Sequence, residues 1–140
     1  MENNGVVKAD QLQITRDTNG KGVTVAPKIS TKDDKPQQFD SVTLQPLKNI
    51  KEVTVTPVDK NGNKVAEPTT QKIDSDKPTT VTLTTPVDAN ALHVEYTPVK
   101  EGEPTEAEIL SVVACMKAEG KVYFARVSWR YKNKFDKNVL

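Results

Sequence analysis

The sequence predicts a mainly β domain that folds as a two-sheet sandwich, and three observations lead to this prediction. Short runs rich in Val, Ile and Thr recur about every ten residues, which is typical of sandwich strands. Asn-Gly dipeptides, which tolerate the positive φ angles of tight hairpin turns, begin at Asn4, Asn19 and Asn61. Residues 123–131 largely alternate apolar and polar side chains, as a strand packed on one face does.

The expected strands flank these turns or follow the same pattern. Two pairs of runs lie on either side of an Asn-Gly turn and are expected to form hairpins: 12–15 with 22–25, and 52–58 with 64–72. In a further strand, Leu92, Val94 and Tyr96 share one apolar face. This strand is expected at 91–97, and the other expected strands are 41–45, 79–85 and 121–132.

One segment, residues 105–118, is expected to form an α-helix. Thr105 and Glu108 have the spacing of a capping box, and Gly120 can end the helix. The apolar residues that follow have the helical spacing i, i+3, i+4, i+7: Ile109, Val112, Val113 and Met116. The β-branched pair in this stripe favours the alternative, a buried strand.

The chain is expected to divide at residue 38. Residues 1–38 are predicted to be an extended N-terminal arm and linker, because residues 30–38 have no apolar period. Residues 39–140 are predicted to be the β-sandwich domain. The apolar share of 35% lies below the usual globular range, which fits a chain whose apolar surface is completed by neighbouring molecules.

Composition argues against several classes of protein. A net charge of +1 gives no general case for a nucleic-acid or membrane partner. A basic row in the last segment, with Arg126 and Arg130, is interpreted as a solvated or partner-facing surface. Cys115 is the single cysteine, so a disulfide-framed scaffold is excluded. The polar opening Met1-Glu2-Asn3-Asn4 does not resemble a signal peptide, so a complete chain is expected to remain in the cytoplasm or to leave it inside an assembly.

No catalytic residue, metal ligand or cofactor is predicted. His93, the single histidine, lies between two apolar residues and is expected to point away from the apolar face toward solvent. Cys115 is expected to be a small core residue. Asp59, Asn61 and Asn63 alternate as calcium ligands do, but no closing acid follows, so they are interpreted as a turn. The chain contains no phosphate-binding loop or nucleophile elbow and is predicted not to be an enzyme.

Residues 41–99 combine Val/Thr strands, Asx-Gly turns and prolines at strand exits, as in 53–57, 59–63, 79–86 and 91–98. In this the segment resembles immunoglobulin-like and jelly-roll modules. Modules of this kind are found in the decoration, fibre and tail proteins of bacteriophages and in extracellular adhesive proteins. The resemblance implies an immunoglobulin-like or jelly-roll β-sandwich and carries no functional residues to this chain.

Together these observations predict a non-catalytic structural protein that acts through protein–protein contacts, as a virion component such as a capsid decoration, head fibre or tail protein. It is expected to be a homo-oligomer or part of a larger assembly. The alternative is an extracellular adhesion or carbohydrate-binding module cut from a larger protein, with Trp129 exposed beside Tyr123 and Tyr131. The residues expected to contact a partner are Val6, Val7, Leu12, Ile14, Arg126, Trp129, Arg130, Phe135 and Leu140.

Overall fold

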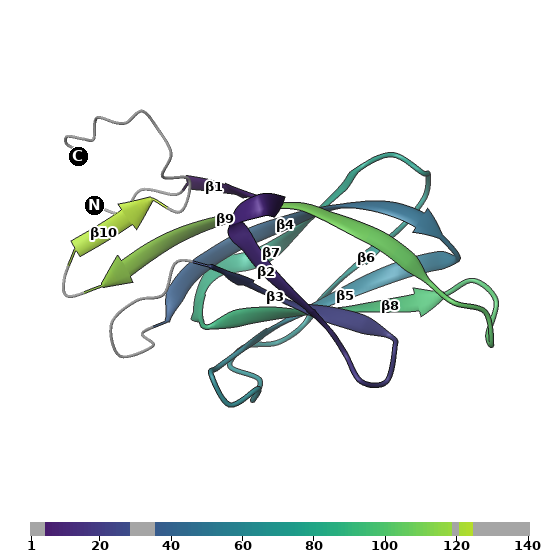
Figure 1. Ribbon diagram of the computed structural model, residues 1–140, viewed down its shortest axis with the longest axis horizontal. Helices are drawn as coiled ribbons and strands as arrows, with labels where there is room; N and C mark the ends of the chain where they lie inside the picture. Colours follow the sequence, from purple (N-terminus) through teal and green to yellow (C-terminus); the bar gives the residue numbers. More distant parts are fainter. Residues whose placement is uncertain (1–4, 29–35, 119–120, 125–140) are drawn as a thin grey trace.

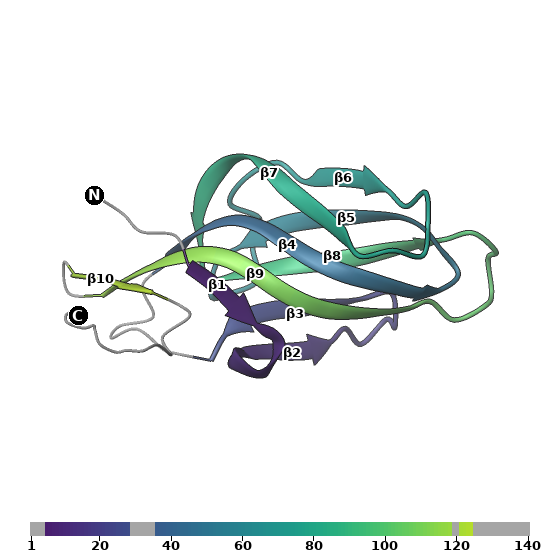
Figure 2. The same cartoon turned by 90° about the horizontal axis from the view of Figure 1, so that it is seen from above.

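The computed structural model describes residues 5–28, 36–118 and 121–124 of the 140-residue chain, and residues 115–118 and 121–124 by their backbone alone. These residues form two antiparallel sheets of five strands each, and the sheets pack face to face (Figure 1). Figure 2 shows the same arrangement from above. The prediction of a mainly β sandwich is confirmed.

The first sheet has the strand order β1-β9-β4-β7, with β10 also paired to β9. Its strands are β1 (Gly5–Lys8), β4 (Gln37–Lys48), β7 (Thr79–Ala89), β9 (Glu106–Ala118) and β10 (Lys121–Phe124). The second sheet has the order β2-β3-β8-β5-β6. Its strands are β2 (Leu12–Arg16), β3 (Gly22–Pro27), β5 (Ile50–Val58), β6 (Thr69–Lys72) and β8 (Ala91–Pro98). The short 3-10 helix η1 (Ala9–Gln11) joins β1 to β2.

The core lies between the two sheets and is built mainly from valine and leucine. Phe39, Val42 and Leu44 of β4 are fully buried, as are Leu92 and Val94 of β8. β-Branched and aromatic side chains suit a pleated surface that packs on one face, which explains why these runs form strands. Successive residues point to opposite faces, so the residues between the buried ones form the outer faces of the sandwich.

Both predicted hairpins are present. β2 pairs with β3 across the turn that contains Asn19 and Gly20, and β5 pairs with β6 across a longer connection. The arm expected at 64–72 is shortened to Thr69–Lys72, with an isolated bridge between Val58 and Lys64. The expected strand 121–132 begins as β10, while residues 125–132 lie outside the described residues.

The helix predicted at residues 105–118 is wrong, because this segment is the strand β9. β9 pairs with β4 on one side and with β1 and β10 on the other, so it lies inside the first sheet. The pairing of β9 with β4 shifts at Leu110, which is the extra residue of a β-bulge between Ile109 and Ser111. The bulge places the buried residues Ile109 and Val112 three positions apart, a spacing that imitates a helix.

The extended arm predicted for residues 1–38 is also corrected. Residues 5–28 form β1, which pairs with β9, and β2 and β3, which join the second sheet through β8. Val7, Leu12 and Val25 of these strands lie in the common core. These three residues therefore help to complete the core of the sandwich itself. The predicted division of the chain at residue 38 remains a prediction about independent folding.

Candidate ligand-binding site

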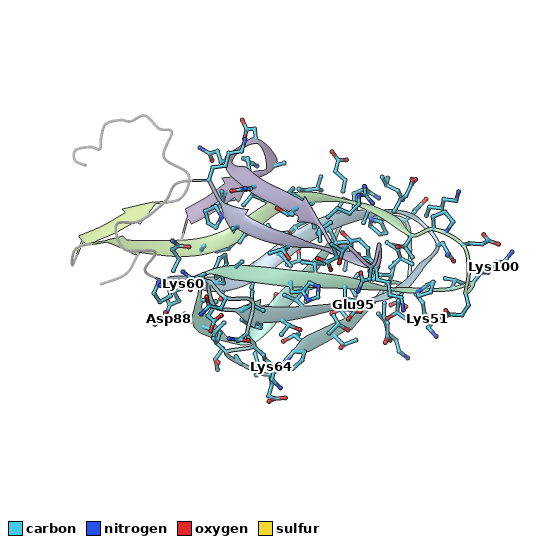
Figure 3. All side chains as sticks on the ribbon, turned by 60° about the horizontal axis from the view of Figure 1, so that its bottom comes forward. Lys51, Lys60, Lys64, Asp88, Glu95 and Lys100 are labelled. Atoms are coloured by element: carbon cyan, nitrogen blue, oxygen red, sulfur yellow. The ribbon has the colours of Figure 1, made fainter. Side chains whose placement is uncertain are left out.

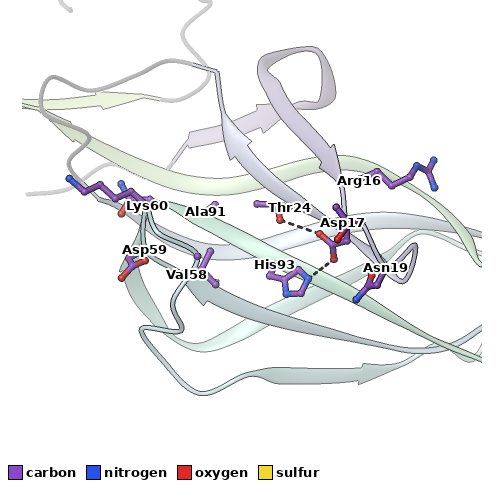
Figure 4. Close-up of a pocket in the computed structure, with 12 residues that line it drawn as sticks. Arg16, Asp17, Asn19, Thr24, Val58, Asp59, Lys60, Ala91 and His93 are labelled. Carbon is purple, nitrogen blue, oxygen red and sulfur yellow. Dashed lines mark hydrogen bonds and ion pairs between the residues drawn. The ribbon is translucent and has the colours of Figure 1, made fainter.

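A shallow hollow of about 610 Å³ lies on the outer face of the second sheet (Figure 4). The β2–β3 turn forms one wall, through Asp17 and Asn19. The connection after β5 forms another wall, through Asp59 and Lys60, and His93 of β8 lies between them. The hollow therefore joins three segments that are far apart in the sequence.

The outward direction of His93 and its neighbours follows from strand register. Thr24 of β3 is the cross-strand neighbour of His93, and on the other side of β8 His93 faces Thr56 of β5. Each alternates with buried neighbours such as Leu92 and Val25, so their side chains point outward. The prediction that His93 points away from the apolar face agrees with this position.

Asp17 fixes the position of His93. The Oδ2 atom of Asp17 lies 2.5 Å from Nε2 of His93, and its Oδ1 accepts a hydrogen bond of 3.4 Å from the Thr24 hydroxyl. The two side chains are only partly exposed, 16% for Asp17 and 34% for His93. Because an ionised carboxylate only accepts hydrogen bonds, Nε2 of His93 carries the donated proton. The pair ties the β2–β3 turn to β8 and holds the imidazole in one orientation.

The opposite wall is a tight turn that is closed by Asp59. Its Oδ1 accepts hydrogen bonds from the backbone N–H groups of Asn63 and Asn61, at 2.9 and 2.8 Å. The backbone of Asp59 also bonds to Asn63 and Gly62, and Gly62 adopts a φ of 85° that favours glycine. The hydrogen bond from the Asn63 backbone lowers the pKa of Asp59. Asp59 is therefore a carboxylate at neutral pH, in a turn as the sequence predicted.

These side chains can bind a polar ligand, and their arrangement does not match a nucleophilic site. In a hydrolytic triad the nucleophile bonds to the histidine, whereas here the Thr24 hydroxyl bonds to Asp17. Across the described ranges, no group of three or more His, Cys, Asp or Glu side chains could hold a metal ion. The same ranges contain no helix that is long and apolar enough to cross a membrane.

The residues predicted to contact a partner divide into three groups. Val6 and Ile14 are exposed, each at 41%. Val7 and Leu12 are buried in the core of the sandwich and are corrected as contact residues of the folded chain. The others lie outside the described residues: Arg126, Trp129, Arg130, Phe135 and Leu140. The side chains of Cys115 and Tyr123 are likewise outside what is described.

Sequence reasoning did not identify Asp17 as a residue of this site. Its position before Thr18-Asn19-Gly20 fits a turn equally well, and its pairing with His93 spans 76 residues. The register of β3 against β8 brings the two together, and the sequence carries no local signal of that register. The sequence feature that could have pointed to this site was the single histidine on the outer face of a predicted strand.

The fold and the hollow define a β-sandwich with a shallow polar site on one sheet. No protein-family model matches the chain, and no curated protein matches it. Among solved structures, a low affinity xylan binding module, CBM86, from the gut symbiont Roseburia intestinalis is similar, at 15% sequence identity and a TM-score of 0.47. The similarity covers 85% of this chain and 99% of that one. A likeness of this degree assigns neither a ligand nor a site to this chain.

Proposed function

We propose that this chain is a non-catalytic carbohydrate-binding module and that a neutral glycan binds in the hollow beside His93. The observation that carries the proposal is the set of fixed hydrogen-bonding side chains in this open hollow. Sugar hydroxyls both donate and accept hydrogen bonds, and Asp17, Asp59, Lys60 and His93 offer both functions there. Because Asp17 and Asp59 are already held by other groups, little ordering is needed when a ligand binds.

The charges around the hollow favour a neutral ligand. Two carboxylates, Asp17 and Asp59, are balanced by the cations Arg16 and Lys60. A phosphate ligand would be favoured by an excess of cationic side chains. Elsewhere on the described surface, exposed side chains of both signs, such as Lys51 and Glu95, are interspersed (Figure 3). This distribution supports an uncharged polymer over a nucleic acid.

The expected affinity is low. Of the side chains that line the hollow, only His93 carries a ring, so the stacking of a sugar on a large aromatic face is not available from these residues. Binding then rests on hydrogen bonds that replace those to water, and each contributes only about 0.5–1.5 kcal/mol. We expect a dissociation constant on the order of 1 mM for a short oligosaccharide. We also propose that the module acts outside the cell.

Affinity electrophoresis tests the proposal, because it detects weak binding to a polymer in the gel. The chain is run through gels that contain xylan, mixed-linkage β-glucan, galactomannan or no polysaccharide. We expect retardation by at least one polymer, and we expect it to be lost in His93→Ala and Asp17→Ala. The matched control is Thr82→Ala, an exposed threonine on the first sheet, which should be retarded as the parent is. If the parent and all three variants were retarded equally, the polysaccharide would bind outside this hollow.

Assembly through strand edges is the second candidate, and one observation favours it. β1 and β2 are adjacent in the chain and lie at the ends of the strand orders of the two sheets, and each exposes one aliphatic side chain, Val6 or Ile14. Exposed strand edges can pair with another chain. A virion component would be one form of this function, although none of the comparisons relates the chain to virion proteins. Light scattering across a concentration range is the test, and a constant monomer mass would exclude self-association.

A further inference from the structure

Two strands share one edge of β9 and lie end to end along it. β10 pairs with β9 as far as Phe124, which lies opposite Cys115. The preceding residue of β9, Ala114, lies opposite Gly5, where β1 begins. Both strands are antiparallel to β9, so β1 takes over the edge at the position where β10 stops.

The register of β10 defines where the chain after Phe124 would pair if it continued along β9. In an antiparallel pair, each step forward on one strand is a step back on the other. Ala125 would therefore lie opposite Ala114, and Ser128 would lie opposite Ser111. The residues of β1 already pair with these positions of β9. β1 and residues 125–128 thus have the same place in the first sheet, and only one of them can hold it at a time.

The sequence of residues 125–128 suits this place. On β9, Val112 and Ala114 are fully buried. In the register of β10, the apolar residues Val127 and Ala125 would lie opposite these two. The polar residues of the segment would then lie on the outer face of the sheet. A shift of one residue would turn Arg126 toward the core, so the apolar pattern and the register agree.

The two segments offer similar side chains to the core. From this place β1 buries Val7, which is 1% exposed, while its neighbour Val6 is 41% exposed. Val127 would replace Val7 by an identical side chain, and Ala125 would add a methyl group where β1 has a glycine. The backbone hydrogen bonds of the ladder are of the same kind for either strand. Neither segment therefore has a large advantage from burial.

Residues 125–128 also need no new connection to reach the edge. They follow directly on β10, which is already paired with β9. Extension of a paired strand closes no further loop, so its entropic cost is that of ordering the added residues alone. The position of β10 therefore brings a second occupant to the end of β1.

We propose that this edge of β9 is a docking site for residues 125–128 of the same chain, which exchange there with β1. β1 holds the edge in the structure. In the exchanged form, residues 125–128 extend β10, and β1 is released together with Val6 and Val7. The exchange controls whether the N-terminal strand is free to contact another molecule. The proposal concerns the first sheet and does not depend on glycan binding beside His93, which lies on the second.

Disulfide trapping in the full chain tests the proposal, in a Cys115→Ser background that removes the native thiol. Cysteines at directly opposite positions of an antiparallel pair are close enough to form a disulfide. Val6→Cys with Val113→Cys should trap β1 at the edge, and Arg126→Cys with Val113→Cys should trap residues 125–128 there. We expect both disulfides after mild oxidation, as identified by mass spectrometry of peptides. Absence of the second disulfide would overturn the proposal.

The matched control is Ser128→Cys with Val113→Cys. These positions are diagonal neighbours in the proposed register, about 7–8 Å apart, which is too far for an unstrained disulfide. This pair should therefore cross-link much less than the Arg126 pair. Equal yields would mean that the segment meets β9 without a defined register. An Arg126 disulfide that joins two copies would mean that the occupant comes from a second chain, and either result would contradict the proposal.

Single substitutions should move the balance between the two forms. Val127→Asp should abolish the Arg126 disulfide and leave the Val6 disulfide unchanged, because a carboxylate would have to enter the core in the exchanged form. Val7→Asp should have the opposite effect and raise the yield of the Arg126 disulfide. If Val7→Asp fails to fold, Val127→Asp still decides, since β1 and its core side chain are untouched. An Arg126 disulfide that survives Val127→Asp would refute the exchange.

Discussion

At the scale of single residues, the buried hydroxyl of Tyr96 makes the chain less stable as the pH becomes alkaline. Burial raises the pKa of Tyr96 from 10.0 to about 12, so the folded state keeps its proton at pH values where the unfolded state has lost it. The free energy of unfolding is therefore unaffected by this group below pH 10, and it falls as the pH rises from 10 toward 12. We expect a loss on the order of 2 kcal/mol in the free energy of unfolding.

Urea unfolding at several pH values measures this effect, with Tyr96→Phe as the matched control. Lysines and arginines also titrate in this range, but they are the same in both proteins. The parent should therefore lose more stability than Tyr96→Phe above pH 10. Parallel curves for the two proteins would show that the Tyr96 hydroxyl ionises normally in the folded state.

Asn49, between β4 and β5, is a second residue with an identifiable structural role. Its backbone has a φ of 59°, and its side-chain amide donates to the carbonyls of Lys100 and Glu103, each at 3.0 Å. Its Oδ1 accepts from the N–H of Lys100 at 2.7 Å. The side chain thus holds the loop before β9 against the β4–β5 turn.

Substitution can separate the effect of the Asn49 side-chain hydrogen bonds on stability from the effect of its left-handed backbone conformation. Asn49→Gly keeps the backbone conformation and loses the hydrogen bonds, so we expect a cost of about 1–3 kcal/mol in the free energy of unfolding. Asn49→Ala also adds the strain of a left-handed residue, about 1–2 kcal/mol more. Chemical denaturation gives both values. An alanine variant that is as stable as the glycine variant would contradict the conformation assigned to residue 49.

At the scale of elements, β9 connects most of the first sheet and contains the bulge at Leu110. Ile109 is 3% exposed, whereas Leu110 is only half-buried. We expect Ile109→Ala to cost about 2–5 kcal/mol in the free energy of unfolding, as truncation of a buried aliphatic side chain does. Leu110→Ala should cost clearly less, and chemical denaturation of both proteins compares them. The reverse order would place the bulge, and the register beyond it, at a different residue.

The same element shows which parts of the structure could be read from the sequence. The hairpins at Asn19-Gly20 and Asn61-Gly62 were predictable because the turn and its flanking strands are local. β9 was not, because its bulge changes the spacing of buried residues from two to three between Ile109 and Val112, and a capping-box pattern precedes it. In the candidate site the outward position of His93 was predictable. Its pairing with Asp17 was not, because it depends on the register between β3 and β8.

At the scale of the whole molecule, the first three strands are divided between the two sheets: β1 belongs to the first sheet, and β2 and β3 belong to the second. Deletion of residues 1–38 would remove β1, β2 and β3, expose the edges of β9 and β8, and take Val7, Leu12 and Val25 from the core. We expect the truncated chain to lose cooperative thermal unfolding, as followed by circular dichroism. A truncated chain that unfolds cooperatively would instead support a domain boundary at residue 38.

Two neighbouring residues of β1 provide a milder version of this test. Val7 is 1% exposed and Val6 is 41% exposed. Val7→Ala should cost about 1–3 kcal/mol in the free energy of unfolding, and Val6→Ala less than about 0.5 kcal/mol. If both substitutions had equally small effects, the segment would behave as the extended arm that the sequence suggested.

Carbohydrate binding in the hollow beside His93 can be decided by an NMR titration of the full chain with a neutral oligosaccharide. The oligosaccharide is a fragment of whichever polysaccharide retards the chain in gels. We expect saturable shifts that cluster at the amide resonances of Asp17, Thr24, Asp59 and His93. Shifts that cluster on β1 and β2, or no saturable shifts at all, would contradict glycan binding in this hollow.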